Sequence, residues 1–269
     1  MCNLNMSDAR IAAELMKAAI GGVSKAQITR TLMEGFGCTE ADMERIINLC
    51  NFKSKPKYVD YQYFYNLAVT RKAHRIFYPF TQVYIQDNFL PAEDCDKLIE
   101  IINGNLRPST VSDPKDACTV SDYRTSKTSD LHYFDNPFFL RIDKKIADFM
   151  GMEPFLGETM QAQKYEIGQY YKEHWDFFTP TTKEYRVYCD WMGQRTWTSM
   201  VYLNDVETGG ETYFKHLNLK LKPKKGTLIT WNNLYKNGLP NLKTMHEACP
   251  PLSGSKFVVT KWWRSWSLI

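Results

Sequence analysis

The chain has 269 residues, of which 43% are hydrophobic and 24% are charged, with 34 lysines and arginines against 30 aspartates and glutamates. This length suits one large domain, or one domain with a small appendage, and the composition excludes disorder, collagen and coiled coil. The net charge of only +4 is far from the dense basic surface of a dedicated nucleic-acid-binding protein. We therefore expect no nucleic-acid partner.

The sequence gives no sign of a membrane segment or of a secretory path. No apolar run approaches the roughly 18 residues that a membrane-spanning helix needs. Near the N-terminus, Glu14 and Lys17 interrupt the apolar residues, unlike the apolar core of a secretion signal. The seven cysteines are scattered and form no CxxC pair, which favours reduced thiols. Together these features predict a cytoplasmic protein with no membrane partner.

Residues 1–52 are predicted to form a small helical module. Ser7, Ser24 and Thr39 stand at N-cap positions, and glycines end the first two of three short helices. The module is a candidate for self-association or for contact with another protein. Residues 53–79, in which basic residues alternate loosely with tyrosines, are predicted to be a connecting segment.

The rest of the chain, residues 80–269, is predicted to be the main domain. A strand is expected over 82–87, and two helices with one apolar face each are expected over 91–102 and 137–150. Short β-rich runs separated by turns follow, at residues 160–165, 197–203, 212–214, 219–221, 226–231 and 256–262. This pattern predicts a mainly β fold with flanking helices, namely a β-sandwich or jelly roll.

The five histidines are few enough to be weighed one by one. His174 and Asp176 are two residues apart, so in an extended backbone their side chains point to the same side. Two histidines and one carboxylate on one face of an octahedral ion leave positions open for a chelating cosubstrate and O2, as in non-haem Fe(II) oxygenases. A second histidine is needed, and both His216 and His246 are candidates.

A series of short motifs runs through residues 80–262 in a fixed order. They are Gln161-x-x-x-Tyr165-x-x-Gly168-Gln169, His174-x-Asp176, Gln194-Arg195, Tyr202-Leu203-Asn204-Asp205-Val206-x-x-Gly209-Gly210-Glu211-Thr212, Lys222-Pro223-x-x-Gly226, Trp231-Asn232, His246-x-x-Cys249-Pro250 and Gly254-x-Lys256-x-x-x-Thr260-Lys261-Trp262. In this order they resemble the prolyl 4-hydroxylase branch of the Fe(II)/2-oxoglutarate dioxygenases. The resemblance implies a double-stranded β-helix as the catalytic domain.

The resemblance also implies a set of metal and cosubstrate residues. It implies His174, Asp176 and His246 as the ligands of Fe(II), and thus selects His246 over His216. It implies that Lys256 pairs with the distal carboxylate of 2-oxoglutarate. A cation or several hydrogen-bond donors are physically required there, because burying that carboxylate without them would cost on the order of several kcal/mol.

Five further residues gain expected roles from the same resemblance. Tyr165 and Thr198 are expected to help hold 2-oxoglutarate. Arg124 and Ser126 are expected beside the substrate, where Arg124 could contact its carbonyl or carboxylate groups. Trp262 is expected to point into the barrel near the iron and contact the substrate.

The implied activity is that of a hydroxylase. O2 and 2-oxoglutarate are the expected cosubstrates, with succinate and CO2 as products and ascorbate as a candidate reductant. Asp176 favours hydroxylation, because related halogenases have a small residue in its place. The expected substrate is a prolyl residue in a peptide or protein. The alternatives are a hydroxylase of a free amino acid or other small metabolite and, in another class, a non-catalytic sensor or scaffold that binds iron and 2-oxoglutarate.

Overall fold

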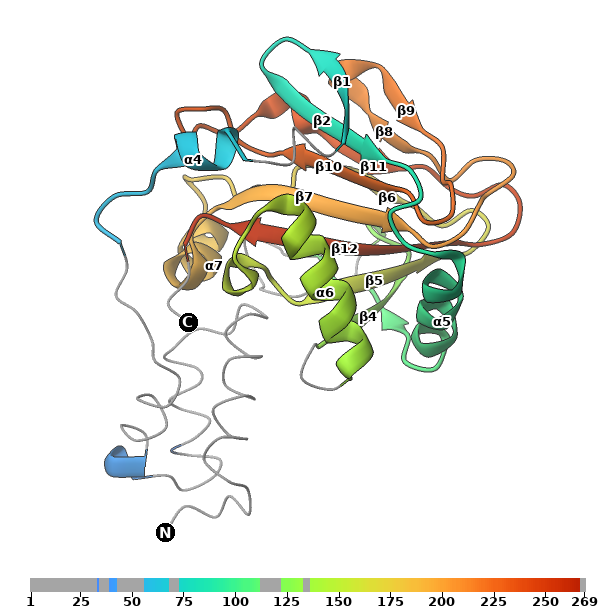
Figure 1. The fold of residues 1–269 in the computed structure, drawn as a ribbon, viewed down its shortest axis with the longest axis horizontal. Helices are drawn as coiled ribbons and strands as arrows, with labels where there is room; N and C mark the ends of the chain where they lie inside the picture. Colours follow the sequence, from blue (N-terminus) through green and yellow to red (C-terminus); the bar gives the residue numbers. More distant parts are fainter. Residues whose placement is uncertain are drawn as a thin grey trace.

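The structure is a computed structural model that describes residues 33, 39–42, 56–67, 73–111, 122–132 and 136–266. Two antiparallel sheets make up most of it, one of eight strands in the order β1-β2-β10-β7-β12-β5-β4-β3 and one of four in the order β6-β11-β8-β9. Helices α5 and α6 lie against the face of the large sheet that points away from the small one (Figure 1). The predicted mainly β fold with flanking helices is confirmed, whereas the predicted module at residues 1–52 falls almost wholly outside the described residues.

The elements have the following bounds. The large sheet contains β1 (His74–Tyr78), β2 (Thr81–Gln86), β3 (Arg107–Pro108), β4 (Lys127–Leu131), β5 (Met160–Tyr165), β7 (Arg195–Tyr202), β10 (Leu228–Asn232) and β12 (Lys256–Arg264). The small sheet contains β6 (Tyr171–His174), β8 (Thr212–Phe214), β9 (Leu219–Leu221) and β11 (His246–Ala248). The helices are α4 (Tyr61–Tyr65), α5 (Ala92–Asn103), α6 (Pro137–Met150) and α7 (Lys183–Met192), with short 3-10 turns η3 (Pro154–Leu156), η4 (Lys215–Leu217) and η5 (Leu242–Thr244).

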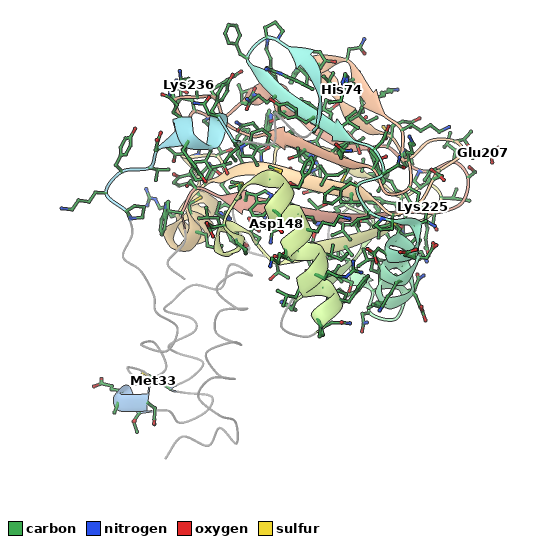
Figure 2. The ribbon with its side chains drawn as sticks, viewed as in Figure 1. Met33, His74, Asp148, Glu207, Lys225 and Lys236 are labelled. Atoms are coloured by element: carbon green, nitrogen blue, oxygen red, sulfur yellow. The ribbon has the colours of Figure 1, made fainter. Side chains whose placement is uncertain are left out.

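Helix α6 shows why these residues form a helix that covers the large sheet. The side chain of Asn136 accepts a hydrogen bond from the Phe138 amide at the N-cap, and Gly151 ends the helix in the left-handed conformation, at φ 65°. Ile142 and Ile146 are completely buried on its inner face, whereas Asp148 is exposed on the outer face (Figure 2). The predicted helix over 137–150 is confirmed. Among the described residues, none of the helices combines the length and the apolar character that crossing a bilayer requires.

Two apolar cores lie on the two sides of the large sheet, and β12 contributes to both. Val259 packs with the residues of α5 and α6, whereas Val258 packs between the sheets with Phe214 and Trp231. Because side chains alternate along a strand, Lys256 shares the inter-sheet side with Val258. The fold thus turns one strand lysine toward the space between the sheets.

Part of the predicted connecting segment packs on the large sheet. Phe64 of α4 is buried, and its carbonyl accepts a hydrogen bond of 2.8 Å from the Trp197 indole nitrogen. Strand β1 pairs with β2 along its length. The described part of residues 53–79 therefore packs on the main domain, and the division of the chain after residues 52 and 79 stays a prediction.

Candidate active site

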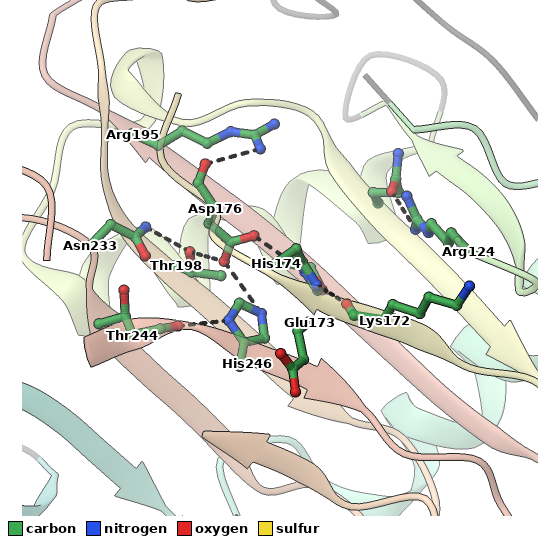
Figure 3. A network of polar contacts seen from close by, with 12 residues as sticks. Arg124, Lys172, Glu173, His174, Asp176, Arg195, Thr198, Asn233, Thr244 and His246 are labelled. Carbon is green, nitrogen blue, oxygen red and sulfur yellow. Dashed lines mark hydrogen bonds and ion pairs between the residues drawn. The ribbon is translucent and has the colours of Figure 1, made fainter. Parts of the chain in front are cut away.

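The three predicted metal ligands come together in the small sheet. His174 ends β6, Asp176 follows two residues later, and His246 begins β11 directly opposite His174 in the antiparallel register. One potential ligand atom of each residue lies within 4.8 Å of the others. The Nε2 atom of His174 is 3.9 Å from Asp176 Oδ1, and that of His246 is 3.8 Å from Oδ2 (Figure 3). His216 is exposed in η4 and takes no part in this group.

Backbone carbonyls fix the orientation of both imidazoles. His174 Nδ1 lies 2.8 Å from the Lys172 carbonyl, and His246 Nδ1 lies 3.0 Å from the Thr244 carbonyl (Figure 3). A carbonyl oxygen can only accept, so each Nδ1 carries the proton and donates. Each Nε2 atom therefore keeps its lone pair, and the two lone pairs face the Asp176 carboxylate. This arrangement is typical of metal-binding histidines.

The charges of the site suit a divalent metal ion. Burial lowers the pKa of His174 to about 3, so its imidazole is neutral at neutral pH. Burial alone would raise the pKa of the Asp176 carboxyl, but His246, His174 and the Arg195 guanidinium outweigh it and hold that pKa below its ordinary value. The site thus offers histidine nitrogens and one anionic oxygen on one face, which is a donor set that fits Fe(II) with positions left open.

A small cavity beside the metal ligands contains a buried lysine. Lys256 is 1% exposed, and its ammonium lies 5.2 and 5.6 Å from the ring centroids of Tyr165 and Tyr202. None of the ion pairs within the described part of the chain includes Lys256. Burial lowers the pKa of Lys256 to about 7. A carboxylate ligand would supply the counter-charge that no described residue provides as an ion pair.

Tyr165 and Thr198 were also predicted to hold the cosubstrate, but only Tyr165 lines the small cavity. Tyr165 pairs with Lys256 across β5 and β12 and lines the same cavity. The Thr198 hydroxyl instead donates to Asp176 Oδ2 at 2.7 Å and accepts from Asn233 Nδ2 at 2.9 Å (Figure 3). Thr198 therefore lies behind the carboxylate ligand and is not among the residues that line the cavity.

A second, wider cavity of about 280 Å³ opens on the same metal ligands. His174, Asp176 and Trp262 line both cavities, so the two meet at the candidate metal centre. Helix α7 contributes Glu184 and Tyr188 to the wall of the wider cavity. No helix or strand was predicted for residues 180–192. The structure has helix α7 there, and this helix flanks the expected substrate side.

Arg124 stands between the two cavities and lines both. It is 8% exposed, and its guanidinium lies 4.9 Å from the ring centroid of Tyr171, which stacks on His174 at 3.6 Å. Its hydrogen bonds reach only neutral groups, namely the side chains of Ser126, Thr128 and Gln161 and the carbonyl of Thr110. Arg124 is therefore a buried cation without an acidic partner among the described residues, beside the predicted metal.

A buried ion cluster forms another wall of the wider cavity. The Glu158 carboxylate accepts two hydrogen bonds from Arg195, at 2.5 and 2.7 Å, and lies 2.6 Å from Arg264 Nε. The Arg195 guanidinium also lies 4.2 Å from the ring centroid of Trp262. Sequence reasoning missed Glu158, which belongs to no motif, and Arg264. Side chains alternate along β12, so the positions of Lys256 and Trp262 could have suggested that Arg264 faces the same side of the sheet.

Comparison with known proteins agrees with this site. Residues 160–264 match the family model described as the 2OG-Fe(II) oxygenase superfamily. The chain is 35% identical over 175 residues to prolyl 4-hydroxylase subunit alpha-2 of Gallus gallus, covering 63% of this chain and 32% of that protein. It is 30% identical over 200 residues to probable prolyl 4-hydroxylase 7 of Arabidopsis thaliana, covering 67% of this chain and 62% of that protein. The chain thus spans about a third of the length of the animal relatives it matches.

A solved structure of a prolyl hydroxylase is also similar to this chain. The viral collagen prolyl hydroxylase of Paramecium Bursaria Chlorella virus-1, in its 2OG complex, superposes with a TM-score of 0.53 at 28% identity, covering 68% of this chain and 95% of that one. The fold, the three candidate ligands and the matched residues fit a 2-oxoglutarate-Fe(II) oxygenase. The chain is thus similar in sequence and in fold to prolyl 4-hydroxylases, in agreement with the resemblance that the motifs predict.

Proposed function

We propose that this protein hydroxylates a prolyl residue in a peptide or protein, using Fe(II), 2-oxoglutarate and O2. One observation carries the proposal: the His174, Asp176 and His246 group lies where two cavities meet, and each cavity contains a buried cation that lacks an acidic partner among the described residues. Lys256 in the small cavity suits the distal carboxylate of the cosubstrate. Arg124, at the wall of the wider cavity, suits carbonyl oxygens of a peptide.

The residues of the chain have separate tasks in this reaction. Bound iron would couple the decarboxylation of 2-oxoglutarate, to succinate and CO2, with transfer of one oxygen atom of O2 into a C–H bond. The two histidines and Asp176 would hold the ion on one face and leave the opposite positions to the cosubstrate and O2. Lys256 would bind and orient 2-oxoglutarate, and the buried position of the small cavity would exclude water.

The wider cavity has the features that a prolyl residue needs. Trp262 offers an apolar wall beside the metal ligands, against which a pyrrolidine ring can pack. Arg124 and Ser126 would position the peptide, because the guanidinium can donate to backbone carbonyls and Ser126 bonds to it at 3.3 Å. The names of the relatives as prolyl hydroxylases support this assignment of the substrate.

Three finer statements belong to the same proposal. Ascorbate would serve as a reductant that keeps the iron in the ferrous state. The protein would work in the cytoplasm, in keeping with the free thiols of Cys95, Cys189 and Cys249. The N-terminal residues 1–52 would serve in self-association or in contact with another protein.

The test is succinate formation from 2-oxoglutarate with Fe(II) and ascorbate, in the presence of a proline-rich peptide. The matched control peptide has alanine in place of each proline, and His246→Ala provides the blank. The proposal predicts that only the proline peptide stimulates succinate formation and gains one oxygen atom. Stimulation by free amino acids or metabolites, but not by the peptide, would show a small-molecule hydroxylase. No succinate above the blank in any mixture would show a non-catalytic binding protein.

A further inference from the structure

The third metal ligand is held differently from the two histidines. Each imidazole is oriented by one backbone carbonyl, whereas Asp176 Oδ2 accepts a hydrogen bond from the Thr198 hydroxyl at 2.7 Å. The terminal torsion of an aspartate is soft, so its carboxylate plane can rotate unless another group fixes it. The bond to Oδ2 fixes that plane, with Oδ1 toward His174 and Oδ2 toward His246. The orientation of Asp176 therefore depends on Thr198.

The Thr198 hydroxyl has its own partner on the other side. Asn233 Nδ2 lies 2.9 Å from Thr198 Oγ1 (Figure 3). The Asn233 amide nitrogen can only donate, and the Asp176 carboxylate can only accept. The single hydroxyl proton of Thr198 must then point at Asp176. The chain of hydrogen bonds has one direction, from Asn233 through Thr198 to Asp176.

Both residues sit in rigid surroundings. Thr198 and Asn233 are each 0% exposed. Thr198 lies in β7 opposite Trp231 of β10, and Asn233 follows the end of β10. The Asn233 backbone is fixed at both ends, because its amide donates to the Thr196 carbonyl at 2.8 Å and its carbonyl accepts from Asn241 at 2.9 Å. Strand pairing therefore sets the position of the amide that orients Thr198.

The orientation of the Asn233 side chain has a cost that calls for an explanation. With its nitrogen on Thr198, its Oδ1 atom is buried and has no hydrogen-bond partner in the structure. Most buried amide oxygens are paired, so a lone one signals a competing demand. Here the Asn233 side chain is oriented so that its nitrogen donates to Thr198, which in turn donates to the candidate metal ligand Asp176.

We propose that Asn233 and Thr198 are positioning residues that hold Asp176 in the orientation needed for metal binding. The inference rests on the proposed function, because it takes the three ligands to be a metal site. It also changes the role expected for Thr198, from contact with the cosubstrate to support of the metal ligand. Loss of such supporting hydrogen bonds typically weakens metal binding by about ten- to a hundredfold.

The experiment measures Co(II) binding to the full chain without 2-oxoglutarate. Co(II) has a visible absorption that reports the geometry of its ligands, and the titration gives a dissociation constant that does not depend on activity. The variants are Thr198→Val and Asn233→Leu, which keep the shape but remove the donor. The matched control is Thr196→Val, on the same strand and equally buried, whose hydroxyl donates to the Trp263 carbonyl instead.

We expect Thr198→Val and Asn233→Leu to bind Co(II) about ten- to a hundredfold more weakly than the wild type, with an altered spectrum. Thr196→Val should bind like the wild type, and Thr198→Ser, which keeps the hydroxyl, should restore binding. The double variant should be no weaker than Thr198→Val alone, because Asn233 acts through Thr198. Circular dichroism checks that each variant is folded, and Asn233→Leu decides the matter if Thr198→Val does not fold.

Two results would overturn the inference. Wild-type affinity and spectrum in both Thr198→Val and Asn233→Leu would show that the carboxylate needs no such support. An equal loss in Thr196→Val would show a general effect on β7. Failure of the wild type itself to bind Co(II) would be a different result, since it would refute the metal site of the proposed function.

Discussion

His246 lies directly across an antiparallel strand pair from His174, with the two ring centroids 4.3 Å apart. The two residues are far apart in the chain, yet the register of β6 and β11 sets their separation. Asp176 joins them because it follows the end of β6 by two residues. One strand pairing therefore brings the two histidines of the candidate metal site together.

Lys256→Met should remove cosubstrate binding without removing metal binding. The ammonium is the buried cation of the small cavity, and a buried carboxylate without its partner loses on the order of 3 kcal/mol, or about a hundredfold in affinity. The measurement is 2-oxoglutarate binding to the Co(II)-loaded protein by calorimetry. Lys220→Met, at an exposed position of β9, is the control. An unchanged 2-oxoglutarate affinity in Lys256→Met would place the cosubstrate elsewhere.

Binding of 2-oxoglutarate should weaken as the pH rises above about 7. Burial lowers the pKa of Lys256 to about 7 from its ordinary 10.5, so above pH 7 the free protein holds a neutral amine. Binding of the dianion then requires uptake of one proton, and the affinity should fall about tenfold per pH unit. Below pH 7 the lysine is already charged, and the affinity should level off.

Calorimetry in buffers with different ionisation enthalpies measures this proton uptake directly. We expect close to one proton taken up per 2-oxoglutarate bound well above pH 7, and none well below it. Constant affinity and no uptake across the whole range would mean that Lys256 is already protonated in the free protein.

Arg124→Gln should raise the KM for the peptide more than it weakens the binding of 2-oxoglutarate. Among the described residues the guanidinium has only neutral hydrogen-bond partners, so its charge is available to the substrate. Hydrogen bonds to charged groups contribute about 1.5–3 kcal/mol, which corresponds to roughly ten- to a hundredfold in KM. Arg141→Gln is the control, because Arg141 is half exposed, already paired with Asp94 and lines neither cavity. Equal effects of the two changes would refute a specific role for Arg124.

Asp143→Ala should destabilise the domain while leaving the active site intact. Asp143 of α6 and Lys261 of β12 form a buried ion pair at 2.5 Å, with side chains 4% and 1% exposed, on the helix-covered face of the large sheet. Removal of the carboxylate leaves the buried ammonium without its counter-charge and with only its hydrogen bond to the Glu158 carbonyl, which costs about 3–5 kcal/mol in the free energy of unfolding.

Urea denaturation measures this loss against two controls. Replacing both partners with apolar residues, in Asp143→Leu with Lys261→Met, should recover most of the stability. Asp96→Ala, which breaks the exposed pair with Lys225, should cost no more than about 1 kcal/mol. A loss in Asp143→Ala as small as that in Asp96→Ala would show that the buried pair is easily replaced.

The sequence predicted the features that depend on local pattern or on matched motifs. Alternation along β12 placed Lys256 toward the inter-sheet space, and the apolar face and terminal glycine of α6 predicted that helix with its observed bounds. The motifs selected His246, which spacing alone did not distinguish from His216. Such predictions are possible from the sequence because each depends on a few neighbouring residues or on an ordered match, and the roles of His246 and Lys256 stay predictions.

The features that were missed depend on contacts between distant residues. Asn233 reaches Thr198 only because β10 pairs with β7 in one register, and no local pattern reveals that register. Glu158 likewise meets Arg195 and Arg264 from a turn that carries no motif. The role expected for Thr198 came from the motif match, whereas its hydrogen bonds come from the packing of the sheet.

The central claim is that this site transfers oxygen to a prolyl residue. The most direct measurement is mass spectrometry of a proline-rich peptide after incubation with the Fe(II)-loaded protein, 2-oxoglutarate and isotopically labelled O2. The account predicts one labelled oxygen atom on a prolyl residue, located by fragmentation, and none with His246→Ala. Succinate formation with an unmodified peptide, or label at a residue other than proline, would contradict it.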